Sequence, residues 1–210
     1  MSDSVIVNIE HWLDQARGGS KEALGRLLGA HMNYLKTLAY AQMDDRLKRR
    51  VGASDIVQET LLEAHRDFLH FLGKTPAEFS GWLRMILINN LKRAIESHLL
   101  AAKRDLRREL SIDEIKGRTD QSAARLETFL ATQNSSVCSQ IQRHESLVRL
   151  SDAIARLPEE YRQVIILRHI QGMAFKDIAE RFHKSSGAIR MIWMRAIEKL
   201  RETSDWSSGR

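Results

Sequence analysis

The sequence predicts an all-α protein of two small helical domains joined by a flexible linker. Apolar residues recur at the spacing of one helical face through most of the chain. Only 6% of the 210 residues are aromatic and 2 are proline, which argues against a β-sandwich. A stretch rich in Ser, Thr and Gln separates two more apolar regions. We therefore expect a domain at residues 1–108, a linker at 109–142 and a second domain at 143–210.

The first domain is predicted to hold several amphipathic helices. A Gly-Gly pair precedes Ser20, which is a suitable N-cap for a helical stretch reaching the end of the thirties. Ser54 is predicted to cap a second helix over residues 54–68. After a loop, a third helix is expected from about Ala77 into the nineties.

The middle segment differs from its neighbours in composition. Its few large apolar residues indicate a linker, with a short helix at Ala123–Leu130 at most. The alternative is a poorly amphipathic helix that docks on a domain.

The second domain is predicted to hold four helices. Leu147 to Leu157 mark the first, and Pro158 opens the second, which ends at Gly172. A short helix at 175–182 and a long helix at 186–201 complete the domain.

The last two helices, joined by a three-residue turn, indicate a helix-turn-helix. Ala179 provides a small residue where the helices meet, and Ile189 fills the core behind the second helix. The outward face combines arginine, which bonds guanine edges or phosphates, with apolar side chains that suit thymine methyls. The alternative is an ordinary helical hairpin whose methionines cover a partner helix. The predicted duplex-DNA-binding residues are Lys184, Ser185, Ser186, Gly187, Ala188, Arg190, Met191, Met194 and Arg195.

Composition narrows the class of partner. A net charge of +6 weakly favours nucleic acid over a membrane surface. The single cysteine, Cys138, excludes an intrachain disulfide and fits a reducing compartment. The chain shows no signal peptide and no apolar run of the ~18 residues that span a membrane. We expect a cytoplasmic protein without membrane insertion.

Motifs for catalysis are missing from the sequence. The eight histidines form no HExxH motif, and neither a Cys/His ligand set nor a phosphate-binding glycine loop occurs. We therefore expect no enzyme activity, no cofactor and no metal site. A metal-dependent nuclease is the enzyme alternative.

Two stretches resemble one protein family. LPEEYRQVIILRHIQGMAFKDIAERFHKSSGAIRMIWMRAIEKLR, from Leu157, resembles region 4 of the bacterial sigma-70 family of RNA polymerase sigma factors, of the extracytoplasmic-function (ECF) type. SDIVQETLLEAHRDF, from Ser54, and FSGWLRMILINNL, from Phe79, resemble region 2 of that family. The resemblance implies a sigma factor that binds core RNA polymerase, recognises −35 and −10 promoter elements and promotes DNA opening.

The family's roles carry over to particular positions. Region 4 reads the −35 element as duplex DNA and meets the flap of the polymerase, and region 2 docks on the clamp of the largest subunit. The implied core-polymerase-binding residues are Asp55, Gln58, Glu59 and Leu62. The residues implied to bind and melt the −10 element as single-stranded DNA are Leu72, Gly73, Lys74, Thr75, Trp82, Asn89, Asn90 and Arg93.

Other expectations remain open at this point. Phe79 either stacks on a base or belongs to the core, and Lys103, Arg104, Arg107 and Arg108 are candidates for phosphate contacts. An anti-sigma factor is a further candidate partner. The two domains are expected to pack together when idle and to separate on polymerase binding. A stand-alone helix-turn-helix regulator and a pure interaction protein are the alternative functions.

The sequence departs from the family pattern at three positions. His183 stands where the turn usually has Gly, Lys184 where a branched apolar residue is usual, and Ile192 where a second basic residue is frequent. A non-glycine residue in the left-handed conformation carries a cost. These exchanges leave the predicted fold intact and bear on the −35 sequence that is read.

Overall fold

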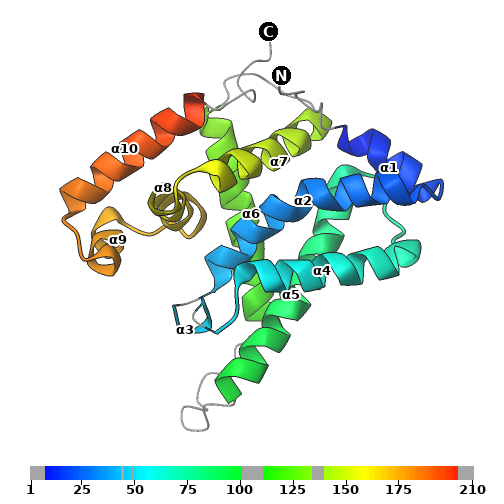
Figure 1. Ribbon diagram of the computed structural model, residues 1–210, viewed down its shortest axis with the longest axis horizontal. Coiled ribbons are helices and arrows are strands. Elements are labelled where there is room, and N and C mark those ends of the chain that lie inside the picture. The colour runs from blue at the N-terminus through cyan, green and yellow to red at the C-terminus, as the bar shows by residue number, and fades with distance from the viewer. Residues whose placement is uncertain (1–7, 44, 49, 101–110, 134–139, 203–210) are drawn as a thin grey trace.

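The computed structural model describes residues 8–43, 45–48, 50–100, 111–133 and 140–202. Every regular element in these ranges is helical, which confirms the all-α prediction. Figure 1 shows α9 and α10 at one end of the molecule, with α6 and α7 between them and the helices near the N-terminus. The elements are α1 (Ile9–Arg17), α2 (Lys21–Gln42), α3 (Asp45–Lys48), α4 (Ala53–Asp67), η1 (Phe68–His70), α5 (Pro76–Leu100), α6 (Ile112–Gln133), α7 (Gln140–Arg156), α8 (Glu159–Ile165), η2 (Ile166–Ile170), α9 (Phe175–Phe182) and α10 (Ser186–Glu202).

Helix α1 lies in a segment for which no role was predicted from the sequence. The Asn8 side chain accepts a hydrogen bond from the His11 amide at 2.9 Å and so caps the helix. Its buried residues follow the i, i+3, i+4, i+7 pattern of one face, which packs on α2. The signal was therefore present in the sequence: Ile9, Trp12, Leu13 and Ala16.

The helix starts test the capping predictions. The Ser20 hydroxyl accepts from the Ala23 amide at 3.2 Å, which confirms Ser20 as the N-cap of α2. The prediction for Ser54 is wrong, because the N-cap of α4 is Gly52, two residues earlier. The Asp55 carboxylate accepts from the Gly52 amide at 3.1 Å and so stabilises the start of α4 from within its first turn.

The loop before α5 is held by a reciprocal cap. The Thr75 hydroxyl accepts from the Glu78 amide at 3.2 Å, and the Glu78 carboxylate accepts from the Thr75 and Lys74 amides at 2.9 and 2.8 Å. These bonds lower the pKa of Glu78, with the Lys74 amide contributing most. Pro76 occupies the first helical position, where its missing N–H costs nothing.

Helix α6 corrects the prediction of an unstructured linker over residues 112–133. The segment forms the docked helix that was the alternative, and it packs on α2, α5, α7 and η2. The composition of this segment suggested a linker because small polar residues occupy part of its buried stripe. The Thr119 hydroxyl, for example, donates to the Ile115 carbonyl at 2.8 Å and is satisfied within the helix. The stripe consists of Ile115, Thr119, Ser122, Ala123, Leu126, Phe129 and Leu130.

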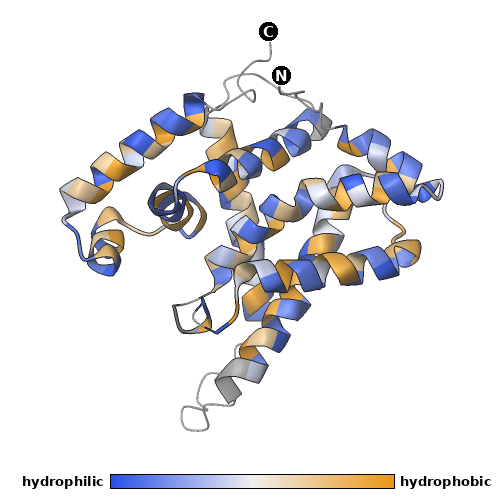
Figure 2. Cartoon of the chain, in the orientation of Figure 1, coloured by the Kyte–Doolittle hydropathy of each residue, from blue (hydrophilic) through white to orange (hydrophobic). Residues whose placement is uncertain are grey.

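Two groups of buried apolar residues stabilise the described part of the chain. The larger takes side chains from α1, α2, α4, α5, α6 and α7 and from parts of α8, η2 and α10. The smaller is the centre of the predicted helix-turn-helix, formed by Val164, Leu167, Ile178, Ala179 and Ile189. Figure 2 shows apolar and polar residues sharing the turns of the helices, as amphipathic packing requires. The larger core thus joins residues from both predicted domains, and the domain boundaries stay a prediction.

Candidate nucleic-acid interface

Helices α9 and α10 meet through a turn with a left-handed residue. His183 has φ 52° and ψ 41°, the region that a residue with Cβ enters at a cost. The amide of Lys184 donates to the Ala179 carbonyl at 3.0 Å and closes the end of α9. The Ser185 hydroxyl accepts from the Ala188 amide at 3.1 Å and caps α10.

The packing of α10 fixes which of its faces meets solvent. Ile189, Ala196, Ile197 and Leu200 are buried, and Trp193 is half-buried against both cores. The opposite face carries two exposed methionines, 49% and 54% accessible, which is unusual for large apolar side chains. Of the predicted DNA-binding residues, the exposed ones are Lys184, Ser185, Gly187, Arg190, Met191, Met194 and Arg195, and the half-buried ones are Ser186 and Ala188.

Three cations near this face have partners within the chain. Lys184 forms an ion pair with Glu160 of α8 at 3.3 Å, and this contact must open before the ammonium can reach a phosphate. Arg168 and Arg190 lie over the Phe175 ring, with guanidinium carbons 4.6 and 5.6 Å from its centroid. A cation held on an aromatic face keeps an ordered side chain at the surface.

A contact that joins α10, η2 and α6 was not predicted from the sequence. The Trp193 indole N–H donates to Nε2 of His169 at 2.8 Å, and the His169 ring stacks on Phe129 of α6 with centroids 4.0 Å apart. Burial, with a smaller contribution from Arg168, lowers the pKa of His169 to about 4. The neutral imidazole can accept the indole proton, so α6 supports the helix that carries the candidate DNA face. No local pattern joins residues so far apart in sequence.

The outer face of α4 carries the four predicted polymerase contacts. Asp55, Gln58, Glu59 and Leu62 are all exposed, and Leu62 is 72% accessible. An exposed leucine within a polar face is the composition expected at the centre of a docking surface. Asp55 also caps α4, so its replacement affects the helix as well as any partner.

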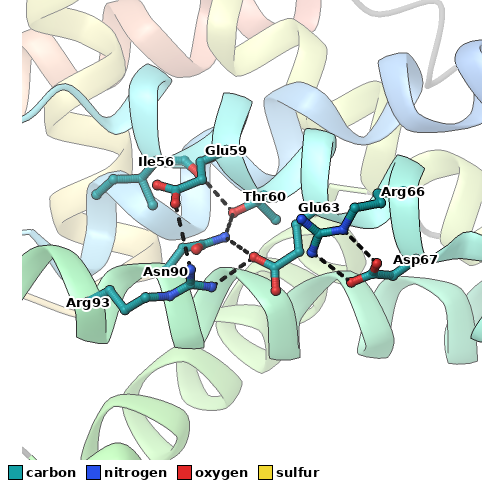
Figure 3. A network of polar contacts seen from close by, with 8 residues as sticks. All are labelled: Ile56, Glu59, Thr60, Glu63, Arg66, Asp67, Asn90 and Arg93. Atoms are coloured by element: carbon teal, nitrogen blue, oxygen red, sulfur yellow. Dashed lines mark hydrogen bonds and ion pairs between the residues drawn. The ribbon is translucent and has the colours of Figure 1, made fainter.

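The contact between α4 and α5 includes two of the predicted −10 residues, Asn90 and Arg93 (Figure 3). Asn90 is 2% exposed, and its amide donates to the Thr60 hydroxyl at 3.1 Å and to Glu63 at 3.3 Å. Arg93 donates to Glu63 at 2.8 Å and lies 3.7 Å from Glu59. Asn90 therefore joins two helices and cannot reach a base in this structure, and Arg93 is engaged by two carboxylates.

The remaining predicted −10 residues lie around the start of α5. Leu72 is 87% exposed, and Lys74 and Thr75 are exposed beside it. Gly73 is tightly placed, since a Cβ at this position would lie 2.3 Å from the Phe71 ring. Asn89 is half-buried. The capped loop thus presents Leu72, Lys74 and Thr75 on a fixed backbone.

The aromatic residues of this region form one cluster. Trp82 is half-buried, with its ring centroid 5.1 Å from Phe71 and 5.7 Å from Phe79. Phe79 is fully buried, which favours the core alternative over base stacking. Trp82 and Phe71 keep part of their surface accessible. The candidate phosphate contacts Lys103, Arg104, Arg107 and Arg108 lie outside the described residues.

Metal-binding clusters and membrane-spanning helices are both absent from the described residues. Among the described residues, no group of three or more His, Cys, Asp or Glu side chains is placed to hold a metal ion. None of the helices within the described ranges is long and apolar enough to cross a membrane.

Comparisons with known proteins agree with the geometry. Residues 147–200 match the family model of sigma-70, region 4. The "ECF RNA polymerase sigma-E factor" of Haemophilus influenzae is 27% identical over 188 residues, which cover 90% of this chain and 90% of that protein. The "Probable RNA polymerase sigma factor RfaY" of Xanthomonas campestris is 27% identical over 201 residues, 95% of this chain and 45% of that protein.

A solved structure shows a weaker likeness. CnrH, in complex with the cytosolic domain of CnrY, is 23% identical, and the match covers 92% of this chain and 94% of that chain with a TM-score of 0.35.

The family model accounts for α7 to α10, and the relatives extend the similarity far beyond those helices. Both relatives carry the name of RNA polymerase sigma factor. Residues 147–200 thus match region 4 of the sigma-70 family, and the chain over most of its length is similar to RNA polymerase sigma factors of the extracytoplasmic-function type.

Proposed function

We propose that the chain binds core RNA polymerase, directs it to promoters with particular −35 and −10 elements and promotes opening of the DNA. The observation that supports this most is the simultaneous exposure of two surfaces. The outward face of α10 and the outer face of α4 are both accessible to partners. A stand-alone regulator needs the first surface but not the second.

The α10 face is proposed to read the −35 element in the major groove. Arg190 and Arg195 supply forked donors, and Met191 and Met194 supply apolar surface for thymine methyls. Gly187 has no side chain to hold the DNA backbone away from the start of the helix. In the proposed complex, Lys184 exchanges Glu160 for a phosphate.

The surface around the start of α5 is proposed to hold the −10 element. Leu72, Lys74 and Thr75 lie on the capped loop, and Trp82 and Phe71 offer aromatic surface beside it. Aromatic faces stack on unpaired bases, and cations follow the phosphates. The chain is proposed to perform no covalent step, and nucleotide addition belongs to the polymerase.

The α4 face is proposed to dock on the clamp of the polymerase's largest subunit. Replacing Leu62 by serine is expected to weaken binding to core enzyme by about tenfold, because an apolar side chain at the centre of an interface is lost. Leu62 makes a more specific test than Asp55, which caps α4, or Glu59, which pairs with Arg93. Affinity is measured by titration of labelled chain with core polymerase.

Ile112→Ser on α6 is the control, because it removes an exposed apolar side chain away from α4. It should leave the affinity for core enzyme unchanged, and both variants should bind −35 duplex like the unmodified chain. Equal affinity of the Leu62→Ser variant and the unmodified chain for core enzyme would remove α4 from the proposed interface.

A further inference from the structure

Two buried polar side chains, His31 and Ser80, and the half-buried His144 join α2, α5 and α7. His31 of α2 is fully buried, and its Nδ1 lies 2.8 Å from the Leu27 carbonyl oxygen. Its Nε2 lies 3.0 Å from the Ser80 hydroxyl of α5. The same hydroxyl lies 2.6 Å from Nε2 of His144, on α7. The contact therefore connects helices of the predicted first domain to the first helix of the predicted second domain.

With both histidines neutral, these contacts form one consistent set of hydrogen bonds. A carbonyl can only accept, so Nδ1 of His31 carries a proton and donates to Leu27. Neutral His31 then has an acceptor at Nε2, and the Ser80 hydroxyl donates to it. The Ser80 oxygen in turn accepts from the Nε2 proton of His144. The packed arrangement thus accommodates both histidines in their neutral forms.

An added proton on either histidine disturbs this arrangement. A proton on Nε2 of His31 would face the Ser80 hydroxyl and the second N–H, since the two Nε2 atoms lie 3.5 Å apart. Burial lowers the pKa of His31 to about 4. Burial first, then the charges of His31 and Arg84, lowers the pKa of His144 to about 3.

Other charged groups around the contact have different titration ranges or are already paired. Arg84 donates to the Tyr34 hydroxyl at 3.0 Å and lies 3.6 Å from Asp120. Burial raises the pKa of Asp152, which accepts from Asn33 at 2.7 Å, so protonation of this carboxylate favours the packed state and opposes the effect of the histidines. The groups are Tyr34 on α2, Arg84 on α5, Asp120 and Glu127 on α6, and Glu145, Arg149, Asp152 and Arg156 on α7.

We propose that His31, Ser80 and His144 form a proton-sensitive latch, which holds α7 on α2 and α5 and releases α7, with the helix-turn-helix that follows it, when the histidines are protonated. The latch concerns the packing of the chain alone. It does not depend on the proposed role with polymerase, and it is tested without polymerase or DNA.

The lowered pKa values of the two histidines determine how the stability of the packed state changes with pH. In the released state the histidines meet water and bind protons near their usual pKa of about 6.5. Stability of the packed state is therefore full above that pH and falls as the pH drops through it. For His144 alone, the ratio of released to packed chains rises about tenfold between about pH 7.5 and about pH 5.5.

The test measures the distance between the two ends of the described chain. Spin labels are attached at Gln15→Cys on α1 and Glu198→Cys on α10, both exposed, in a chain in which Cys138 is replaced by alanine. Pulsed electron spin resonance gives the distance distribution across the pH range, and circular dichroism reports the helix content. We expect the population of chains with a longer distance to grow about tenfold relative to the population with the short distance, while the helix content stays constant.

Three variants make the test specific. His144→Gln keeps an amide donor for Ser80 but takes no proton, so the tenfold change that His144 contributes should be lost. His169→Gln replaces another buried histidine of lowered pKa and should keep the response. Ser80→Ala removes the hydroxyl that links the two histidines, and this variant should show the longer distance already at about pH 7.5. A pH-independent distance in the unmodified chain, or the same response in His144→Gln, would overturn the latch.

Discussion

Replacing Arg190 by alanine is expected to weaken binding of a −35 duplex by about 1–3 kcal/mol, concentrated at one base pair. The side chain is exposed on the outward face of α10, one turn beyond the Ser185 cap, beside the Phe175 ring. Arginine in this position has the forked donors that bond O6 and N7 of guanine. The measurement is the affinity for a set of duplexes that differ by single base pairs in the −35 element.

Two further variants separate base reading from charge. Arg190→Lys keeps the charge but loses the fork, so it should lose the sequence preference while keeping most of the affinity. Lys116→Ala removes an exposed cation of α6 and should change neither. If Arg190→Ala weakens all duplexes equally, and Arg190→Lys restores binding, the arginine contacts phosphate and reads no base.

Replacing Phe79 by alanine is expected to lower the free energy of unfolding by about 3–5 kcal/mol, the cost of a large cavity in an apolar core. The ring is fully buried and lies 5.4 Å from Phe71 and 5.1 Å from His31, measured between centroids. Urea unfolding followed by circular dichroism measures the change.

Leu72→Ala is the control for this region, because its side chain is 87% exposed. It should change the free energy of unfolding by less than about 0.5 kcal/mol and affect only DNA opening. If Phe79→Ala left stability unchanged but reduced DNA opening, base stacking and not core packing would be its role.

The helix-turn-helix was the part best predicted from sequence. Its spacing is local: Ala179 and Ile189 lie ten residues apart, and burial of one face of α10 determines which residues point outward. The positive φ at His183 was expected because the turn requires it whatever residue is present. Local periodicity sufficed because both helices pack mainly on each other and on the helix just before them.

Predictions failed where contacts distant in sequence decide the structure. The amide of Asn90 looked suited to a base edge, but the side chain is buried and its N–H groups donate to Thr60 and Glu63 of another helix. Helix α6 was hidden by its composition, because Thr119 and Ser122 take buried positions that apolar residues usually fill. The buried histidines gave no local signal, since their partner Ser80 lies on a third helix.

Run-off transcription tests the central claim most directly. Core RNA polymerase alone, and core enzyme with this chain, are given a library of promoters randomised in the −35 and −10 elements. The proposed function predicts sequence-selective initiation only in the presence of the chain, with both elements enriched in the transcribed templates. Selective DNA binding without any initiation would indicate a stand-alone regulator, and that result would contradict the proposed function.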